Sequence, residues 1–408
     1  MTSNALPPTF TRLAWSNLAA QSAEQIALAA APIVAVLALG AGVAATGVLQ
    51  TVQTLPFVLF AIPAGLLVDR TSRRRVMAGA EALRALSLLA VLALASFGWL
   101  TLPMLAALGF VGACGTVAYS VAAPALVPSL VPPETLALAN GRLELARTVA
   151  FASGPALAGA LVGWTGGPLA FGAATALSLG AVVLLSRLGE PACTPARDRD
   201  ALREIREGAQ FVFSHRLLRP VFVTQLVFNA ALFTLHAVYV PYAIATLGLS
   251  AFAVGLTLAT YGVGMIAGAL AAPRILRAMS FGHVMALGPI TGLAASIVML
   301  STIWMPAPSL AALSFFLMGV GPTTWVIAAA TLRQSVTPAP LLGRVFAINL
   351  TAYGARPAGA ALGALVGGLY GAEACLVVAA IGFLVQAVVI VISPVRSLTA
   401  QPAMATAA

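Results

Sequence analysis

Residues 169–187 read Leu-Ala-Phe-Gly-Ala-Ala-Thr-Ala-Leu-Ser-Leu-Gly-Ala-Val-Val-Leu-Leu-Ser-Arg, and the only charge in this stretch is Arg187 at its end. A helix of about 20 apolar residues rises roughly 30 Å, which is the thickness of the hydrocarbon core of a bilayer. The stretch is therefore typical of a helix that crosses a membrane. It lacks the alternation over about ten residues that a membrane β-strand would need.

The same kind of apolar run recurs along the whole chain of 408 residues. The chain is 61% hydrophobic and 8% charged, whereas a soluble domain has about 25% charged residues. This composition excludes a soluble enzyme and a nucleic-acid-binding protein. The 37 Gly and 26 Pro residues fit a membrane protein, because neighbouring helices satisfy the backbone groups that such residues leave free. We predict an all-α membrane protein with twelve transmembrane helices, near residues 13–39, 44–68, 76–97, 102–128, 135–163, 169–187, 219–246, 251–273, 282–304, 308–333, 341–367 and 373–394.

The 21 basic residues are all arginines, and their positions predict the orientation of the chain. Thirteen lie in the termini and loops on one side of the membrane, and none lies in the connections on the other side. Because basic loops stay in the cytoplasm, we predict a multi-pass protein of the bacterial cytoplasmic (inner) membrane with both termini cytoplasmic. The thirteen residues are Arg12, Arg70, Arg73, Arg74, Arg75, Arg197, Arg199, Arg203, Arg206, Arg216, Arg274, Arg277 and Arg396.

The two halves of the chain resemble each other at an offset of 204 residues. Gln21 and Gln25 of the first span recur as Gln225 and Asn229 of the seventh span. A parallel repeat of this kind predicts two pseudo-symmetric six-helix bundles. We expect the first bundle at residues 1–188, a cytoplasmic linker with a short amphipathic helix at 189–218, and the second bundle with a cytoplasmic tail at 219–408.

Residues 65–75 connect the second and third spans and read Gly-Leu-Leu-Val-Asp-Arg-Thr-Ser-Arg-Arg-Arg. They resemble the signature loop of the major facilitator superfamily, G-x-x-x-D-R-x-G-R-[KR]. The resemblance implies a major facilitator fold in which Asp69 holds the two halves together on the cytoplasmic side, near the start of the eleventh span. The alternative is that the arginines only set the topology. The matching residues are Gly65, Asp69, Arg70, Arg73 and Arg74, whereas Ser72 stands where the family has Gly.

The fifth span resembles the antiporter motif of the same superfamily, g-x8-G-x3-G-P-x2-G-G. Its small residues would allow close packing against the other half, and its proline would bend the helix. In the family this motif accompanies export more than import. The alternative is generic packing in an alanine-rich helix. The matches are Gly141, Gly154, Pro155 and Gly159, with Ala150 and Ala158 as departures, and Arg147 lies within the motif.

Two further stretches resemble the exporter branch of the superfamily that includes enterobactin and macrolide efflux proteins. They are residues 131–134, which end at Glu134, and residues 343–345 around Arg344. The resemblance assigns both residues to the cytoplasmic gate. The fourth span departs from many drug–proton antiporters of the family, because residues 108–115 contain no arginine.

Charges inside the spans point to function, because a charge in hydrocarbon is costly and normally faces a cavity or a partner. Glu24 lies about 17 Å from the start of its span, near the middle of the membrane. We expect it to bind the coupling proton, since it has no local partner in the sequence. The alternative is a structural carboxyl group that is permanently protonated or paired with an arginine.

Several other charged residues within the spans can be explained by pairing on the same helix, whereas Arg356 cannot. Arg147 is about 18 Å deep and lies three residues after Glu144, so the two can neutralise each other. Glu81 and Arg84 lie nearer the inner surface and pair locally. Arg356 lies about 22 Å deep without an acid within a turn, so it must contact another helix, water or an anionic substrate.

Polar and aromatic residues of several spans are candidates for the substrate cavity. The first and seventh spans each present one polar face at a spacing of three and four residues, and their counterparts in the superfamily line the central cavity. Packing or lipid contact is the alternative for the aromatic residues. The candidates are Asn17, Gln21, Gln25, Tyr119, Gln225, Asn229, His236, Tyr239, Trp325 and Arg356.

The sequence therefore predicts a secondary active transporter, not an enzyme, that exports a small amphipathic or hydrophobic compound in exchange for protons by alternating access. We expect a monomer in the lipid bilayer with a small-molecule substrate, no nucleic acid, no cofactor and no metal. ATP hydrolysis is excluded because a chain without Lys has no P-loop. Two alternatives stay open: uptake or uniport of a polar or anionic solute held by Arg356, and flipping of lysophospholipids.

Overall fold

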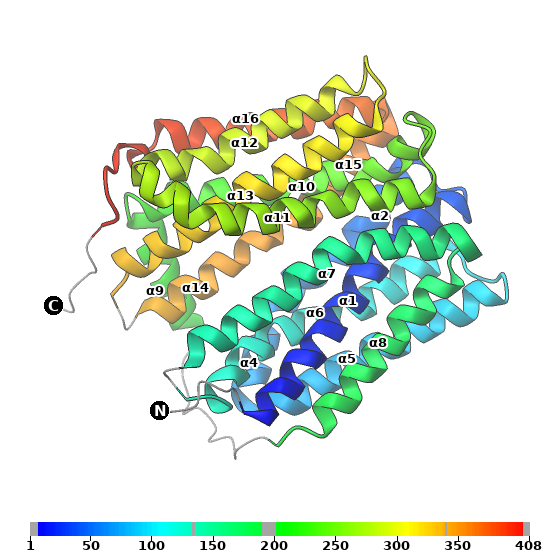
Figure 1. Cartoon of the computed structure of the whole chain (residues 1–408), viewed down its shortest axis with the longest axis horizontal. Helices are drawn as coiled ribbons and strands as arrows, with labels where there is room; N and C mark the ends of the chain where they lie inside the picture. Colours follow the sequence, from blue (N-terminus) through cyan, green and yellow to red (C-terminus); the bar gives the residue numbers. More distant parts are fainter. Residues whose placement is uncertain (1–6, 133–134, 190–200, 339–340, 403–408) are drawn as a thin grey trace. The chain divides into compact units, whose positions relative to one another are not determined.

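The computed structural model describes residues 7–132, 135–189, 201–338 and 341–402. Within these ranges every regular element is a helix. The chain divides into two compact units (Figure 1). Unit 1 comprises residues 1–198 together with 249–259, and unit 2 comprises residues 199–248 together with 260–408.

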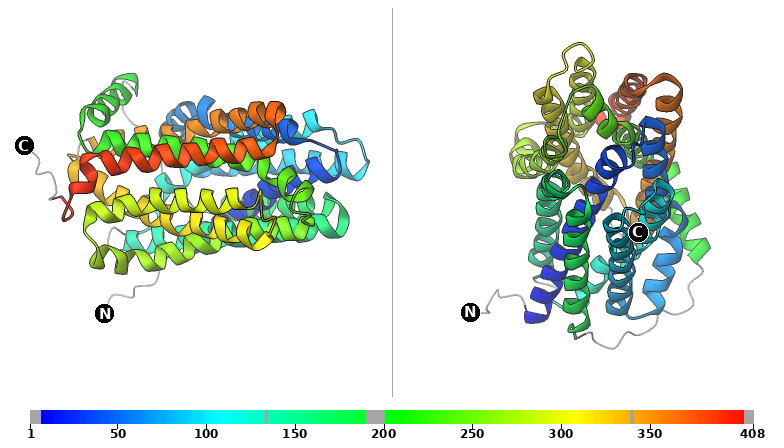
Figure 2. Two further views of the ribbon diagram at one scale, coloured as in Figure 1. Left: turned by 90° about the horizontal axis from the view of Figure 1, so that it is seen from above. Right: turned by 90° about the vertical axis from the view of Figure 1, so that its right-hand side faces the viewer.

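The helices of unit 1 run alongside one another, coloured blue to green in Figures 1 and 2. Helix α1 packs against α7 and α8, and α5 packs against α6 and α8. The elements are α1 (Pro8–Leu37), α2 (Val43–Thr54), α3 (Pro56–Leu59), α4 (Ala61–Arg70), α5 (Arg73–Ser96), α6 (Leu102–Leu126), the 3₁₀ turn η1 (Val127–Ser129), α7 (Leu136–Thr165) and α8 (Pro168–Ser186).

Unit 2 is built in the same way around α10, which packs against α15 and α16, and around α12, which packs against α13 and α16. Its elements are α9 (Ala201–Ser214), α10 (Leu218–Ala245), α11 (Ala251–Ala278), α12 (Phe281–Ser301), α13 (Pro308–Val336), α14 (Leu342–Thr351), η4 (Ala352–Gly354), α15 (Ala355–Tyr370), α16 (Ala372–Ile392) and η5 (Pro394–Ser397). The first turns of α11, up to Ala259, cluster with unit 1.

Ten helices among the described residues are long and apolar enough to cross a membrane, which confirms the multi-pass membrane protein. Each of the ten coincides with a predicted span to within a few residues. The helix α9 lies in the segment where the sequence predicts an amphipathic helix.

The two remaining predicted spans, 44–68 and 341–367, are not continuous helices. The first is divided into α2, α3 and α4, and the second into α14, η4 and α15. Proline explains both divisions, because its ring clashes with the carbonyl group four residues earlier and its nitrogen has no hydrogen to donate. Pro63 disturbs the helix near Leu59, where α3 ends, and Pro357 disturbs it near Tyr353, within η4.

Candidate functional site

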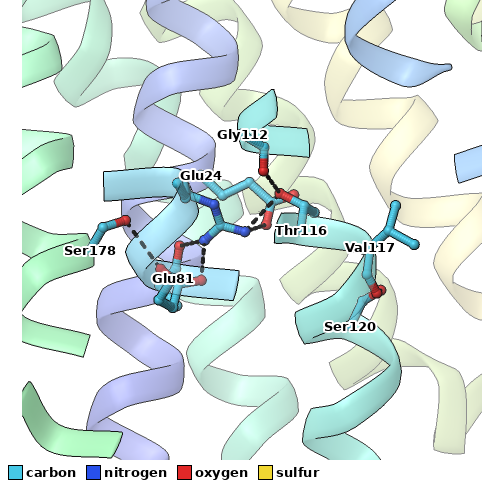
Figure 3. A network of polar contacts seen from close by, with 9 residues as sticks. Glu24, Glu81, Gly112, Thr116, Val117, Ser120 and Ser178 are labelled. Atoms are coloured by element: carbon cyan, nitrogen blue, oxygen red, sulfur yellow. Dashed lines mark hydrogen bonds and ion pairs between the residues drawn. The ribbon is translucent and has the colours of Figure 1, made fainter. Parts of the chain in front are cut away.

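A buried cluster of charges in unit 1 surrounds the guanidinium group of Arg84 on α5 (Figure 3). Arg84 Nη1 donates to Glu81 Oε1 at 2.6 Å and to the backbone oxygen of Ala20 at 3.1 Å. Its Nη2 donates to Thr116 Oγ1 at 2.7 Å and lies 3.4 Å from Glu24 Oε2. One arginine thus joins α1, α5 and α6.

The contact between Glu24 and Arg84 agrees with the alternative that the sequence left open for Glu24, a carboxyl group paired with an arginine. Glu24 has an ionic partner in Arg84, sixty residues away in the chain. Arg84 also lies deeper than expected, because it is eleven residues past the start of α5 at Arg73, or about 17 Å at 1.5 Å per residue. Counted in the same way from the start of α1 at Pro8, Glu24 lies about 24 Å along its helix, so depth alone would not have linked the two residues.

The two carboxyl groups of the cluster differ in their surroundings. The Glu81 side chain is fully buried, and its Oε2 accepts a hydrogen bond from Ser178 of α8 at 3.1 Å. The Glu24 side chain retains 16% exposure. Glu81 and Arg84 form the predicted pair three residues apart on α5, which confirms that local pairing. Ser178 and Thr116 are the two members of the cluster that the sequence analysis missed.

A cavity of about 60 Å³ adjoins the cluster. Glu24, Arg84 and Thr116 line its polar side, and Gln53, Leu105 and Phe171 belong to the rest of its wall. A cavity can hold a water molecule when it offers more than about 15 Å³ and several polar partners. The cavity therefore has room for water next to the carboxyl group of Glu24.

The other predicted cavity residues of α1 contact α7 or lie beside it. Asn17 donates from Nδ2 to the backbone oxygen of Leu143 at 3.3 Å. Gln25 is buried against Gly154, where a Cβ atom would lie 2.4 Å from Gln25 Cβ. Gln21 is half-buried. These contacts make the polar face of α1 part of its packing with α7.

A second arginine within the spans, Arg356 at the start of α15, is half-buried in unit 2. Its Nε donates to Asn229 Oδ1 of α10 at 3.0 Å. Its guanidinium carbon lies 4.2 Å from the ring centre of Tyr353 and 5.2 Å from that of Phe233. Asn229 in turn donates to the backbone oxygen of Gln225 at 2.9 Å. The contacts described for Arg356 are therefore an amide and two aromatic rings.

Among the remaining aromatic candidates, Tyr119, Tyr239 and Trp325 are buried and His236 is half-buried. His236 lies between the rings of Phe233 and Phe315, and Tyr239 meets Phe315 edge-on with the ring centres 4.6 Å apart. Tyr119 belongs to the apolar core of unit 1, and Trp325 belongs to that of unit 2. Tyr119 and Trp325 thus take the packing role that the sequence left open.

The loop that resembles the signature motif is described only in part. The side chain of Asp69 and the whole of Glu134 lie outside the described residues. A Cβ atom at Gly65 would meet no atom within 4 Å, so close helix approach does not require this glycine in the described structure. Arg70 is exposed and Arg73 is half-buried.

Arg344, the other predicted gate residue, binds the linker helix α9. Its guanidinium group contacts Glu204 at 3.4 Å and also forms an ion pair with Glu207. Glu207 accepts a further hydrogen bond from Arg203 at 2.9 Å. The hydrogen bond from Arg203, together with the charge of Arg344, lowers the pKa of Glu207 below its ordinary value. The described contacts of Arg344 are thus within unit 2.

The glycines of the antiporter-like motif in α7 differ in how closely neighbouring atoms approach them. A Cβ atom at Gly159 would lie 2.4 Å from the backbone oxygen of Ala251, whereas one at Gly141 would meet nothing within 4 Å. Pro155 lies inside α7, which continues past it. Arg147 forms the expected ion pair with Glu144, and both side chains are exposed. Close packing is therefore a property of Gly154 and Gly159, but not of Gly141.

In the part of the chain that the structure describes, no three His, Cys, Asp or Glu side chains come together as a metal site.

The chain matches one protein-family model and several curated proteins, of which two are described. The model of the Major Facilitator Superfamily matches residues 13–356. The chain is 30% identical over 254 residues to the uncharacterized MFS-type transporter y4rN of Sinorhizobium fredii, which covers 60% of this chain and 59% of that protein. It is 28% identical over 159 residues to macrolide efflux protein A of Streptococcus pyogenes, which covers 38% of this chain and 39% of that protein. Each match spans less than two thirds of the relative's length.

Solved structures with the same fold are also transporters. A bacterial homologue of the iron transporter ferroportin in an inward-facing state aligns with a TM-score of 0.73 at 19% identity, over 95% of this chain and 98% of that chain. The D-xylose–proton symporter aligns with a TM-score of 0.71 at 14% identity, over 93% and 96%. At these identities the similarity concerns the fold alone.

Proposed function

Because the chain belongs to the major facilitator superfamily, and is thus a membrane transporter of small molecules and not an enzyme, we propose that it exports a small amphipathic or hydrophobic compound in exchange for protons. The family resemblance of residues 65–75 and the predicted fold are confirmed by this match. In the proposed cycle, Glu24 binds and releases the proton while the transporter alternates access to its substrate site. We take the arginine-rich side as cytoplasmic, with both termini there.

The observation that carries the proposal is the charge balance around Arg84. Two carboxyl groups, those of Glu24 and Glu81, share one guanidinium group. If both are ionised, these three side chains together carry a net charge of one negative unit inside the membrane, which is costly. Binding of one proton makes the cluster neutral. The cluster is therefore suited to exchange a single proton.

The proton is best assigned to Glu24. Glu81 is fully buried and is held by Arg84 and Ser178, whereas Glu24 is partly exposed and lines a cavity with room for water. The contact of Glu24 with Arg84, at 3.4 Å, is longer than that of Glu81, at 2.6 Å. Protonation of Glu24 removes its charge attraction to Arg84, so it loosens α1 from α5 and leaves the pair within α5 in place.

Two observations support export of an amphipathic compound. The motif in α7 resembles that of antiporters, with Gly154 and Gly159 in close contact with neighbouring residues. One relative is a macrolide efflux protein, although it matches only 38% of this chain. We propose the substrate class on these grounds.

A second candidate function is uptake or uniport of a polar or anionic solute at Arg356. A guanidinium group that stacks on aromatic rings can still bind a carboxylate or phosphate in its own plane. Arg356 stacks in this way on Tyr353 and Phe233. Loss of solute binding in Arg356→Ala, without a requirement for a proton gradient, would favour this candidate over export.

Everted membrane vesicles test the proposal. Wild type should accumulate a radiolabelled macrolide or an amphipathic cationic dye when a proton gradient is imposed, and Glu24→Gln should lose this dependence on the gradient. Glu144→Gln is the matched control, because Glu144 belongs to an exposed ion pair on α7. Gradient-driven accumulation by Glu24→Gln at the wild-type level would refute the role of Glu24.

A further inference from the structure

A groove of about 640 Å³ lies in unit 1 and is lined by residues of α4, α5 and α6. Its wall combines two kinds of side chain. Arg70, Thr71, Ser72 and Arg75 line one part, where α4 ends and α5 begins, and the other part is apolar. The apolar lining residues include Leu67, Val76, Gly79, Leu83, Cys114 and Ala118.

The charged part of the groove lies at the arginine-rich end of the helices. Arg70 and Arg75 are both exposed, so their guanidinium groups are available to a ligand at the membrane surface. The segment 69–75 contains four arginines and one acid, Asp69. Its net positive charge suits an anionic group.

The apolar part of the groove extends into the membrane. Leu83 lies ten residues past Arg73 on α5, which corresponds to a depth of about 15 Å. This is about the thickness of one leaflet of the hydrocarbon core. Leu67 and Leu83 remain 49% and 40% exposed, so the groove opens over apolar side chains. A free phosphate or carboxylate ion would leave this wall unused, whereas an acyl chain would cover it.

We propose that this groove binds one anionic phospholipid, with its phosphate at Arg70 and Arg75 and one acyl chain along Val76, Gly79 and Leu83. Basic pockets between membrane helices are suited to anionic headgroups. The groove ends at about mid-membrane depth, so it holds a lipid of the arginine-rich leaflet. Such a lipid would fill the space beside α4. Prolines separate this helix from α2, which belongs to the same predicted span. This inference is independent of the proposed function.

The test is lipid binding to the purified full-length chain, measured by native mass spectrometry with phosphatidylglycerol and phosphatidylcholine of identical acyl chains. Wild type should retain phosphatidylglycerol with a preference of roughly thirtyfold, as expected for two arginines at an anionic headgroup. In the double variant Arg70→Gln, Arg75→Gln the preference should disappear. Arg74→Gln should keep it, because Arg74 donates to the backbone oxygens of Ser186 and Leu188 instead.

A second pair of variants tests the acyl-chain part of the groove. A Cβ atom at Gly79 would meet no atom within 4 Å, so Gly79→Leu should fill the groove without a clash and abolish retention of phosphatidylglycerol. Gly180 on α8 is equally open but does not line the groove, so Gly180→Leu is the control and should bind as wild type.

Three outcomes would overturn the inference. One is equal retention of the two lipids by wild type, and another is unchanged retention in Gly79→Leu. The third is displacement of the lipid by an excess of free glycerol phosphate, because this would identify a site for the anionic group alone.

Discussion

Two equivalent positions of the repeat hold different residues in unit 1 and in unit 2, and their contacts differ. Gly154 of α7 packs against Gln25 of α1 in unit 1. The corresponding residues in unit 2 are Arg356 and Asn229, at offsets of 202 and 204, and they form a hydrogen bond. Glu24 corresponds to Phe228, whose ring packs against that of Phe383. The repeat therefore conserves which helices meet, but it does not conserve where the charge lies.

This difference determines what each arginine can do. Arg84 of unit 1 has two carboxylate partners, so its surroundings change charge when one proton binds. The described partners of Arg356 in unit 2 are an amide and aromatic rings, which do not titrate in the physiological range. The proton exchange that we propose is therefore assigned to the cluster around Arg84 in unit 1.

The largest effect is expected from removal of the arginine in unit 1. Arg84→Gln removes the cation that Glu24 and the buried Glu81 share, which should destabilise the protein by about 3–5 kcal/mol. Unfolding of the purified protein in detergent measures this loss. The triple variant Arg84→Met, Glu24→Gln, Glu81→Gln carries no charge in the cluster and should recover more than half of it. Wild-type stability of Arg84→Gln would contradict the charge balance.

The next largest effect concerns a close helix contact that occurs within each unit. In unit 1 it joins α1 and α7, and in unit 2 it joins α10 and α15. A Cβ atom at Gly154 would lie 2.4 Å from Gln25 Cβ, and one at Gly359 would lie 2.1 Å from the backbone oxygen of Ala230. Alanine at either position should cost about 1–3 kcal/mol, because the paired helices must move apart. Gly141→Ala is the control, since its Cβ has open space, and it should be neutral or stabilising. Equal behaviour of all three variants would reject the proposed packing.

A smaller effect is expected at the arginine of unit 2. Arg356→Gln loses the hydrogen bond to Asn229 and the contacts with two aromatic rings, so it should cost about 1–2 kcal/mol. The same unfolding measurement applies. A loss as large as that of Arg84→Gln would remove the distinction between the two arginines.

The smallest effect concerns the attachment of α9 to unit 2. The pKa of Glu207 is lowered, chiefly by the hydrogen bond from Arg203, so its contribution to stability is present above its ordinary value of 4.5 and is lost as the pH falls through the lowered value. Hydrogen exchange of the α9 amides, corrected for intrinsic rates, should then increase by about threefold or less. In Glu207→Gln this pH dependence should be absent, and an unchanged dependence would exclude Glu207 as its source.

Part of the site could be predicted from the sequences of single helices. The pairs Glu81–Arg84 and Glu144–Arg147 follow from a spacing of three residues on one helix, and both are present. The partner of Glu24 was not predicted, because the contact joins α1 to α5 across sixty residues. The roles of Tyr119 and Trp325 were equally undetermined, since an aromatic side chain in an apolar helix can face the core, the lipid or a cavity.

The sequence by itself determined that this is a multi-pass helical membrane protein with the major facilitator fold. The reason is local: each span must satisfy its own backbone hydrogen bonds within hydrocarbon, so the apolar runs alone predict helices. Only the tertiary structure decided that Arg84 joins Glu24 and Glu81, and that a groove with two arginines opens beside α4. Both features depend on the rotation and spacing of neighbouring helices, which the apolar pattern of a single helix does not encode.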